Sequence, residues 1–234
     1  MNFKDKVVVI TGAAGGLGRA VAAKFEAADA STVLLDVAHE ALVKAFPDQR
    51  ATRLTVPTDL MALSSVNAAI EAAMARFGQI DVLCNIAGGF RMGAPVHQTP
   101  VETWDLMMNL NAGSVLNTAR AVVPRMLATG GGRIINVAAV GGTSGRPMMG
   151  AYSASKSVVI RLTESMALEL REQHINVNCV LPSIIDTAPN RAAMPDADAS
   201  RWVTPDALAD VMLFLASDAA RAIHGAAIPV VGLS

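Results

Sequence analysis

A near-continuous apolar run that ends at a glycine-rich turn constrains the fold of this chain more than any other feature. The run KVVVIT covers residues 6–11, and a helix is predicted from Gly16 to Ala28 because Leu17, Val21 and Phe25 recur at intervals of four. A buried strand that turns directly into a helix is typical of a parallel α/β sheet. The turn between them contains Gly12, Gly15, Gly16 and Gly18. Glycine lets a ligand approach the backbone closely, and the positive end of a helix favours phosphate there.

The same alternation of strand and helix continues to the end of the chain. Strong helical patterns lie between short β-rich runs, so strands buried on both faces are predicted, with helices covering each face. We therefore expect an α/β Rossmann fold, a doubly wound parallel sheet of about seven strands, in one domain spanning residues 1–234. Pro124 is expected to bend or divide the long helical region, and Thr204 and Pro205 to begin the last helix. The further predicted strands are 32–36, 51–56, 80–85, 133–138, 175–181 and 226–231, and the further helices are 63–77, 101–128, 152–173 and 204–217.

Composition excludes several classes of function. Apolar residues make up 52% of the chain, charged residues 17%, and the formal net charge is −1 without a basic block, so nucleic acid and anionic membranes are not expected partners. No apolar run is long enough for a membrane span, and no signal peptide is visible. Cys84 and Cys179 lie in apolar segments and are expected to be buried free thiols, which fits a cytoplasmic protein. The four histidines show no metal-ligand spacing, so no metal is expected.

Asp36 ends the second predicted strand, 18 residues after Gly18. In the dinucleotide-binding motif, a carboxylate at this place accepts hydrogen bonds from the adenosine ribose hydroxyls and repels a 2′-phosphate. The glycine turn contains no Lys or Arg that would attract such a phosphate. We therefore expect NAD(H) to be preferred over NADP(H). The alternative is that Asp36 is a loop residue that caps a helix.

Tyr152 and Lys156 are four residues apart in a predicted helix and therefore share one face. A free tyrosine has a pKa near ~10, and a neighbouring ammonium group together with an oxidised nicotinamide favours the phenolate. Tyr152 is the only tyrosine in the chain, and it follows a glycine-containing loop after the fifth strand. This predicts an acid–base pair at the mouth of the sheet. The alternative is a surface pair on an amphipathic helix.

Five motifs in this order and spacing resemble the short-chain dehydrogenase/reductase family over essentially the whole chain. They are the TGxxxGxG turn, Asn85-Ile-Ala87-Gly88, Asn111 seven residues after Trp104, the YxxxK pair, and the segment from Pro182 to Thr187, in which Ser183 replaces the family's glycine. The resemblance implies an NAD(H)-dependent oxidoreductase with catalytic residues Tyr152, Lys156 and Asn111, a substrate loop at about 183–203, and a homotetramer or homodimer formed through broad apolar helices. It implies that the cofactor is held by Thr11, Gly12, Gly15, Gly16, Leu17, Gly18, Asp36, Asp59, Leu60, Asn85, Ala87, Gly88, Tyr152, Lys156, Pro182, Ile185 and Thr187.

One position departs from the family pattern. The catalytic serine of the family lies thirteen residues before the tyrosine, and here that residue is Ala139. Loss of such a donor costs on the order of 100-fold in rate. The substrate therefore does not need the donor, or Thr143 or Ser144 replaces it, or catalysis is weak. The last case describes a catalytically weak NAD(H)-binding or scaffold protein, which is the rival to the enzyme.

A narrower resemblance bears on this departure. Residues 185–202 and 84–89 are similar to dihydropteridine reductase, an NADH enzyme type that also has alanine in place of the serine. Its quinonoid dihydropterin substrate takes hydride on a conjugated ring. The alternative is that these segments mark a subfamily with varied substrates. The residues expected to line the substrate site, or else to fill the core, are Phe90, Arg91, Met92, Met148, Met149, Met194 and Trp202.

Overall fold

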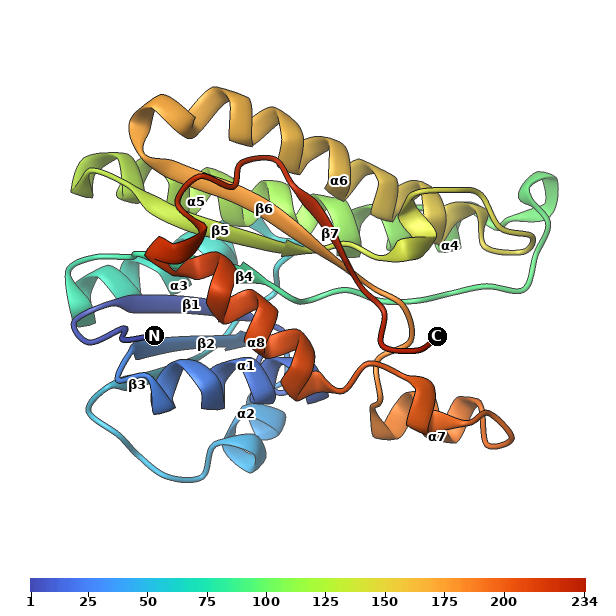
Figure 1. The fold of residues 1–234 in the computed structure, drawn as a ribbon, viewed down its shortest axis with the longest axis horizontal. Coiled ribbons are helices and arrows are strands. Elements are labelled where there is room, and N and C mark those ends of the chain that lie inside the picture. The colour runs from blue at the N-terminus through green and yellow to red at the C-terminus, as the bar shows by residue number, and fades with distance from the viewer.

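The computed structural model describes all residues from Met1 to Ser234 and contains one seven-stranded parallel sheet (Figure 1). The strand order is β3-β2-β1-β4-β5-β6-β7, so the chain reverses direction across the sheet between β1 and β4. This confirms the predicted Rossmann fold. The strands are β1 (Val7–Thr11), β2 (Ser31–Asp36), β3 (Arg53–Pro57), β4 (Val82–Asn85), β5 (Gly132–Val137), β6 (Ile175–Pro182) and β7 (Ala227–Val230).

Helices cover both faces of the sheet. Alternate residues of β1 belong to different apolar clusters: Val8 and Ile10 pack with α1 and α8, whereas Val7 and Val9 pack on the side of α3 and α5. Because every residue of β1 is buried, its sequence is apolar from Val7 to Ile10 and ends in a buried threonine. The helices are α1 (Gly16–Ala27), α2 (His39–Ala45), α3 (Leu63–Phe77), α4 (Val101–Met107), α5 (Ser114–Thr129), α6 (Gly150–Leu170), α7 (Ala188–Ala193) and α8 (Pro205–Ala216).

The long helical region before β5 differs from its prediction. The α-helix continues through Pro124, and the irregular part is instead a π-helical segment, η2 (Met108–Gly113), between α4 and α5. Pro124 therefore does not divide the helix. The helices α2 and α7 were not predicted, because each is short and presents at most one buried side chain. Most other boundaries differ from the predicted ones by one or two residues, and Thr204 caps α8 as expected.

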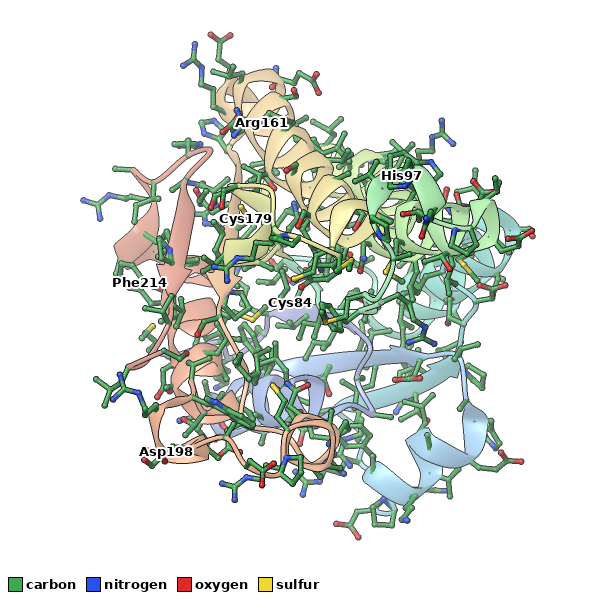
Figure 2. All side chains as sticks on the ribbon, turned by 90° about the vertical axis from the view of Figure 1, so that its right-hand side faces the viewer. Cys84, His97, Arg161, Cys179, Asp198 and Phe214 are labelled. Carbon is green, nitrogen blue, oxygen red and sulfur yellow. The ribbon has the colours of Figure 1, made fainter.

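Two further expectations from the sequence concern the cysteines and a membrane-spanning helix. Cys84 and Cys179 are free and buried, as expected, and both lie within the body of the molecule in Figure 2. None of the helices combines the length and the apolar character that crossing a bilayer requires.

The carboxyl ends of β1, β2, β4, β5 and β6 meet at one edge of the sheet, because all the strands are parallel. A ligand of an open parallel sheet binds at this edge, next to the point where the strand order reverses.

Candidate active site

The glycine-rich turn is packed tightly against the end of β4. Thr11 is buried, and its Oγ1 accepts hydrogen bonds from the backbone N–H groups of Ile86 (2.9 Å) and Ala87 (3.1 Å). Gly12 has a φ of +63°, and a Cβ added there would lie 2.9 Å from the Cα of Ala87. A Cβ on Gly18 would lie 2.2 Å from the carbonyl oxygen of Gly12. The first and last glycines are therefore required for packing.

The middle of the turn is less crowded, since a Cβ on Gly15 would lie 3.3 Å from the carbonyl oxygen of Gly12. Helix α1 begins at Gly16, has no side-chain cap and carries no acidic residue in its first turn. A Cβ on Gly16 would meet only the side chain of Thr187, 3.0 Å away, while Leu17 points into the core. The first turn of a helix leaves backbone N–H groups without partners. The turn therefore fits a phosphate-bearing ligand at the free N–H groups of this helix start, with Thr187 packed beside Gly16.

Asp36 lies at the end of β2, beside this turn. Its Oδ2 accepts a hydrogen bond from the backbone N–H of Ala14 at 3.0 Å, and its side chain forms no ion pair. The next residue, Val37, is apolar and 72% exposed, so the position after the carboxylate offers no positive charge. Such a site can accept hydroxyl groups and disfavours a second anion.

The segment after β3 is held by local bonds. Asp59 is exposed, its backbone N–H donates to Ser65, and its carboxylate accepts from the N–H of Met61. Leu60 is buried, and its carbonyl oxygen accepts a hydrogen bond from Asn117. The segment is thus fixed from two sides next to the end of β2.

Asn85 ends β4, but its side chain faces the interior. Its Nδ2 donates to Asn136 Oδ1 at 2.9 Å, its Oδ1 accepts from Thr118 at 2.8 Å, and Asn136 in turn donates to Thr163. These four side chains are buried and join β4, β5, α5 and α6. Only the backbone of Asn85 is left to contact a ligand. The sequence pattern identified the residue but not this buried polar network.

Tyr152 lies in the first turn of α6, at the carboxyl edge of the sheet. Its ring makes an edge-to-face contact with Phe90, with the centroids 4.8 Å apart, and the ring also lies against Gly141. Burial raises the pKa of Tyr152 to about 12. The expected lowering of this pKa by Lys156 together with an oxidised nicotinamide stays a prediction, since in the protein alone burial is the dominant effect.

Lys156 lies one turn further along the same face of α6. Its side chain is buried, and Nζ donates a hydrogen bond to the carbonyl oxygen of Val137 at 2.9 Å. Burial lowers the pKa of Lys156 to about 8. The ammonium therefore points toward the end of β5.

Asn111 lies in the π-helical segment η2 and is completely buried. Its amide pairs with the backbone of Gly89 in both directions, at 2.9 and 3.1 Å, and its Nδ2 also donates to Ser155 at 3.0 Å. A Cβ on Gly88 would lie 2.7 Å from Asn111 Oδ1 and 3.2 Å from Lys156 Nζ. Asn111, Gly88 and Lys156 therefore meet at one point. Ser155 was missed by sequence reasoning, although its place three residues after Tyr152 in the helix is a usable signal.

Ala139 is buried in the loop after β5. Of the two hydroxyl groups expected to replace the missing serine, that of Thr143 donates to the carbonyl oxygen of Val140 at 2.8 Å. Ser144 is exposed and makes no hydrogen bond with its side chain. Thr143 thus has a local role, and neither side chain is oriented by a bond toward Tyr152.

The last predicted contact segment leaves β6 at the same edge. Pro182 is buried, and Ile185 and Thr187 are half-buried. The Thr187 hydroxyl accepts from the N–H of Asn190 at the start of α7, so its methyl group faces Gly16. The segment therefore reaches from the sheet to the glycine-rich turn.

Two hollows in the surface differ in whether predicted site residues line them. One of about 300 Å³ is lined by four of the residues predicted to face substrate, namely Arg91, Met92, Met148 and Met149. One of about 600 Å³ lies at the opposite edge of the sheet, where Lys6 pairs with Asp81 and Arg133 with Asp218, and it includes no predicted site residue. Tyr152, Lys156 and Asn111 line neither hollow, but the smaller one reaches Gly150 and Ala151, next to Tyr152 at the start of α6, and we therefore assign the chemistry to that edge of the sheet. Trp202 is buried and Met194 half-buried, and no three His, Cys, Asp or Glu side chains converge as metal ligands.

Comparison with known proteins gives one consistent result. The family model of the short chain dehydrogenases matches residues 6–198. The 2-(R)-hydroxypropyl-CoM dehydrogenase of Xanthobacter autotrophicus is 34% identical, over 97% of this chain and 98% of that protein. A short-chain type dehydrogenase/reductase from Mycobacterium ulcerans superposes with a TM-score of 0.94 at 26% identity, covering 100% of this chain and 90% of that one. An NAD+-bound xylitol dehydrogenase gives a TM-score of 0.91 at 27% identity, covering 99% and 100% of the two chains.

Proposed function

This chain belongs to the short-chain dehydrogenase family of oxidoreductases, and we propose that it uses NAD(H) to transfer hydride to or from a small-molecule substrate, with Tyr152 as the acid–base residue. The observation that carries the proposal is the meeting of Lys156 and Asn111 at Gly88, with Tyr152 one turn earlier in α6, at the carboxyl edge of the sheet and beside an uncapped glycine-rich helix start. Each feature alone is common. Their coincidence at the point where the strand order reverses is what a dinucleotide enzyme requires.

The cofactor end supports NAD(H) over NADP(H). Gly15, Gly16 and Thr187 would surround the pyrophosphate, and Asp36 would accept the ribose hydroxyls. A 2′-phosphate would meet the Asp36 carboxylate with only apolar Val37 beside it. The solved xylitol dehydrogenase with bound NAD+ is consistent with this choice. The remaining contacts, from the residues after β3, β4 and β6, would come mainly from backbone and apolar groups.

Tyr152 and Lys156 have separate roles in the proton chemistry. Bound NADH supplies the hydride, and the substrate atom that gains negative charge then needs a proton. Burial keeps Tyr152 protonated at neutral pH, so it is ready to donate in the direction of reduction. The Lys156 ammonium stabilises the phenolate that remains. Asn111, held by Gly89 and Ser155, fixes the backbone beside Lys156.

Two classes of substrate are candidates, and they differ in whether they need a hydroxyl donor at the position of Ala139. A ketone or alcohol develops charge on one oxygen and benefits from a hydroxyl donor that Ala139 does not provide. A quinonoid dihydropterin takes hydride on a conjugated ring and needs no such donor. The absence of an oriented replacement at Thr143 or Ser144 favours the dihydropterin. The rival function, a catalytically weak NAD(H)-binding or scaffold protein, rests on the same alanine.

A substrate screen that follows NADH absorbance tests the proposal. Quinonoid dihydropterin is assayed beside ketones, quinones and β-ketoacyl thioesters, with the Tyr152→Phe protein as the matched control. We expect turnover of at least one substrate that disappears in the variant. NADH binding without turnover of any substrate would support the scaffold function instead.

We also propose that residues 1–234 form one domain that assembles as a homodimer or homotetramer in the cytoplasm. Large apolar side chains are exposed on α4, α5 and α6, among them Trp104 (44%), Leu116 (42%) and Leu168 (66%). These helices are the ones that the family resemblance pairs between subunits. Light scattering of the purified protein tests this, and a monomer at micromolar concentration would contradict it.

A further inference from the structure

The C-terminal segment Val231–Ser234 is hydrogen-bonded to both ends of the predicted substrate loop. At the beginning of the loop, Ser183 Oγ donates to the carbonyl oxygen of Val231 at 2.9 Å and lies 2.6 Å from Ser234 Oγ. At its end, Arg201 exchanges two bonds with Leu233, each of 2.8 to 2.9 Å. In Figure 1 the chain end lies beside the segment that leads from β6 to α7. Residues separated by about 50 positions in the sequence are thus joined.

The two ends of the loop are also joined to each other. Val203 donates to the carbonyl oxygen of Ile184 at 3.1 Å and accepts from the N–H of Asp186 at 2.8 Å, which makes a short parallel bridge. Gly232 has a φ of +61°, and a Cβ there would lie 3.0 Å from the carbonyl oxygen of Arg201. The close approach of the tail therefore needs glycine at this position.

The interior of the loop has no comparable anchor. Residues 188–200 form hydrogen bonds only with residues 185–203, as in the ion pair of Asp186 with Arg191. Most of these residues are exposed, and Figure 2 shows Asp198 at the outer rim of the molecule. The position of the loop therefore depends on the hydrogen bonds at its two ends.

We propose that Ser183 is a positioning residue, which fixes the residues from Pro182 to Ile185 against the nicotinamide end of the cofactor by bonding them to the C-terminal segment. The proposal rests on the proposed function, because it assumes that this segment contacts NAD(H). It also accounts for the serine at a position where the family has glycine. Glycine cannot make the bonds to Val231 and Ser234. The hydroxyl of Ser234 acts on the cofactor only through Ser183.

Two ligands separate positioning from a general loss of structure. NADH includes the nicotinamide, whereas ADP-ribose lacks only that ring and keeps the adenosine and both phosphates, which meet Asp36 and the turn. We expect Ser183→Ala to weaken NADH binding about three- to tenfold, the range of one net hydrogen bond, and to leave the Kd for ADP-ribose unchanged. Ser183→Thr keeps the hydroxyl and should restore NADH affinity. Thr129→Ala, which removes a hydroxyl bonded only within α5, is the matched control.

A double-mutant cycle with Ser234→Ala completes the test. We expect Ser234→Ala to weaken NADH binding as well, and the double variant to match Ser183→Ala alone. Unchanged NADH affinity in both single variants, additive effects, or equal weakening of NADH and ADP-ribose would each overturn the proposal. Nicotinamide fluorescence measures binding without turnover. These outcomes therefore test only the hydrogen bonds between Ser183 and the C-terminal segment. A wild-type protein that binds no NADH would overturn the proposed function together with it.

Discussion

The carboxylate of Asp36 accepts a hydrogen bond from the backbone N–H of Ala14, which joins the end of β2 to the glycine-rich turn. The bond occupies one carboxylate oxygen and holds the side chain at the edge where an adenosine ribose would lie. The same charge that fixes the turn would therefore select the cofactor. This double role has a consequence for mutagenesis, because removal of the side chain and removal of its charge are different experiments.

Asp36→Asn should reduce the preference for NADH without loosening the turn. The amide keeps an acceptor for the Ala14 N–H but no longer repels a 2′-phosphate. We expect wild type to bind NADH at least tenfold more tightly than NADPH and the variant to narrow this ratio to about threefold, consistent with the removal of one partly screened charge. Fluorescence titration with both cofactors measures it. Equal binding of the two cofactors by wild type would contradict the assignment of Asp36.

Tyr152→Phe should remove most turnover and leave NADH affinity within about twofold. The phenol acts on the proton and not on the dinucleotide, so kcat falls while binding is kept. Because Phe keeps the edge-to-face contact with Phe90, the packing of the site is preserved. Steady-state kinetics and NADH titration give the two quantities. A variant with near-native kcat would show that another group delivers the proton.

Ala139→Ser should distinguish the two substrate candidates. If the natural substrate is a ketone, the new hydroxyl stabilises the developing charge, and kcat/KM rises about tenfold or more, which corresponds to about 1.4 kcal/mol. If it is a quinonoid dihydropterin, the added group at this buried position crowds the ring, and the rate stays flat or falls. We expect the second outcome for the natural substrate. Large gains on every ketone, with no dihydropterin activity in wild type, would eliminate the dihydropterin candidate.

Lys156 should destabilise the fold at neutral pH. Burial lowers its pKa from 10.5 to about 8, so between these values the unfolded chain binds more protons than the folded one, and folding stability rises as the pH increases. We expect Lys156→Met to raise the free energy of unfolding by about 2 kcal/mol at pH 7, from about 3 kcal/mol of charging penalty less about 1 kcal/mol for the lost bond to Val137. By pH 10.5 the charging penalty is almost gone while the bond to Val137 is still missing, so the gain should disappear and become a loss of less than about 1 kcal/mol.

Chemical denaturation at the two pH values checks this prediction. Lys24→Met is the control, because Lys24 is on the surface and pairs with Asp210. A gain for Lys156→Met that is the same at pH 7 and pH 10.5 would show that packing, and not charge, causes it. The variant should be inactive at both values.

The fold could be predicted because the parallel strands are buried on both faces. Val7 to Thr11 shows this most clearly, since each residue of the strand lies in the interior and the first four are apolar without a break. Helix α7 could not be predicted in the same way. It has six residues and no buried side chain, so hydrophobic periodicity gives no signal, and only the Thr187 cap and the following proline mark its start.

The candidate site could be predicted where one local element carries it. Tyr152 and Lys156 share a helix face by periodicity alone, and the glycines follow from their place between strand and helix. The bonds from Asn111 to Gly89 and Ser155 could not be derived, because they join residues 22 and 44 positions apart. The raised pKa of Tyr152 also escaped prediction, since burial is a property of the assembled site.

The self-contained bonding of residues 188–200 has an evolutionary consequence. A segment whose hydrogen bonds are all made within the loop can be exchanged for another of different length or sequence without disturbing the sheet. Mutations that alter its interior would then carry little penalty in folding, whereas changes at Ser183, Arg201 or Gly232 would carry more. Changes within residues 188–200 could therefore alter the choice of substrate while the rest of the molecule stayed constant. This segment can be replaced as a unit.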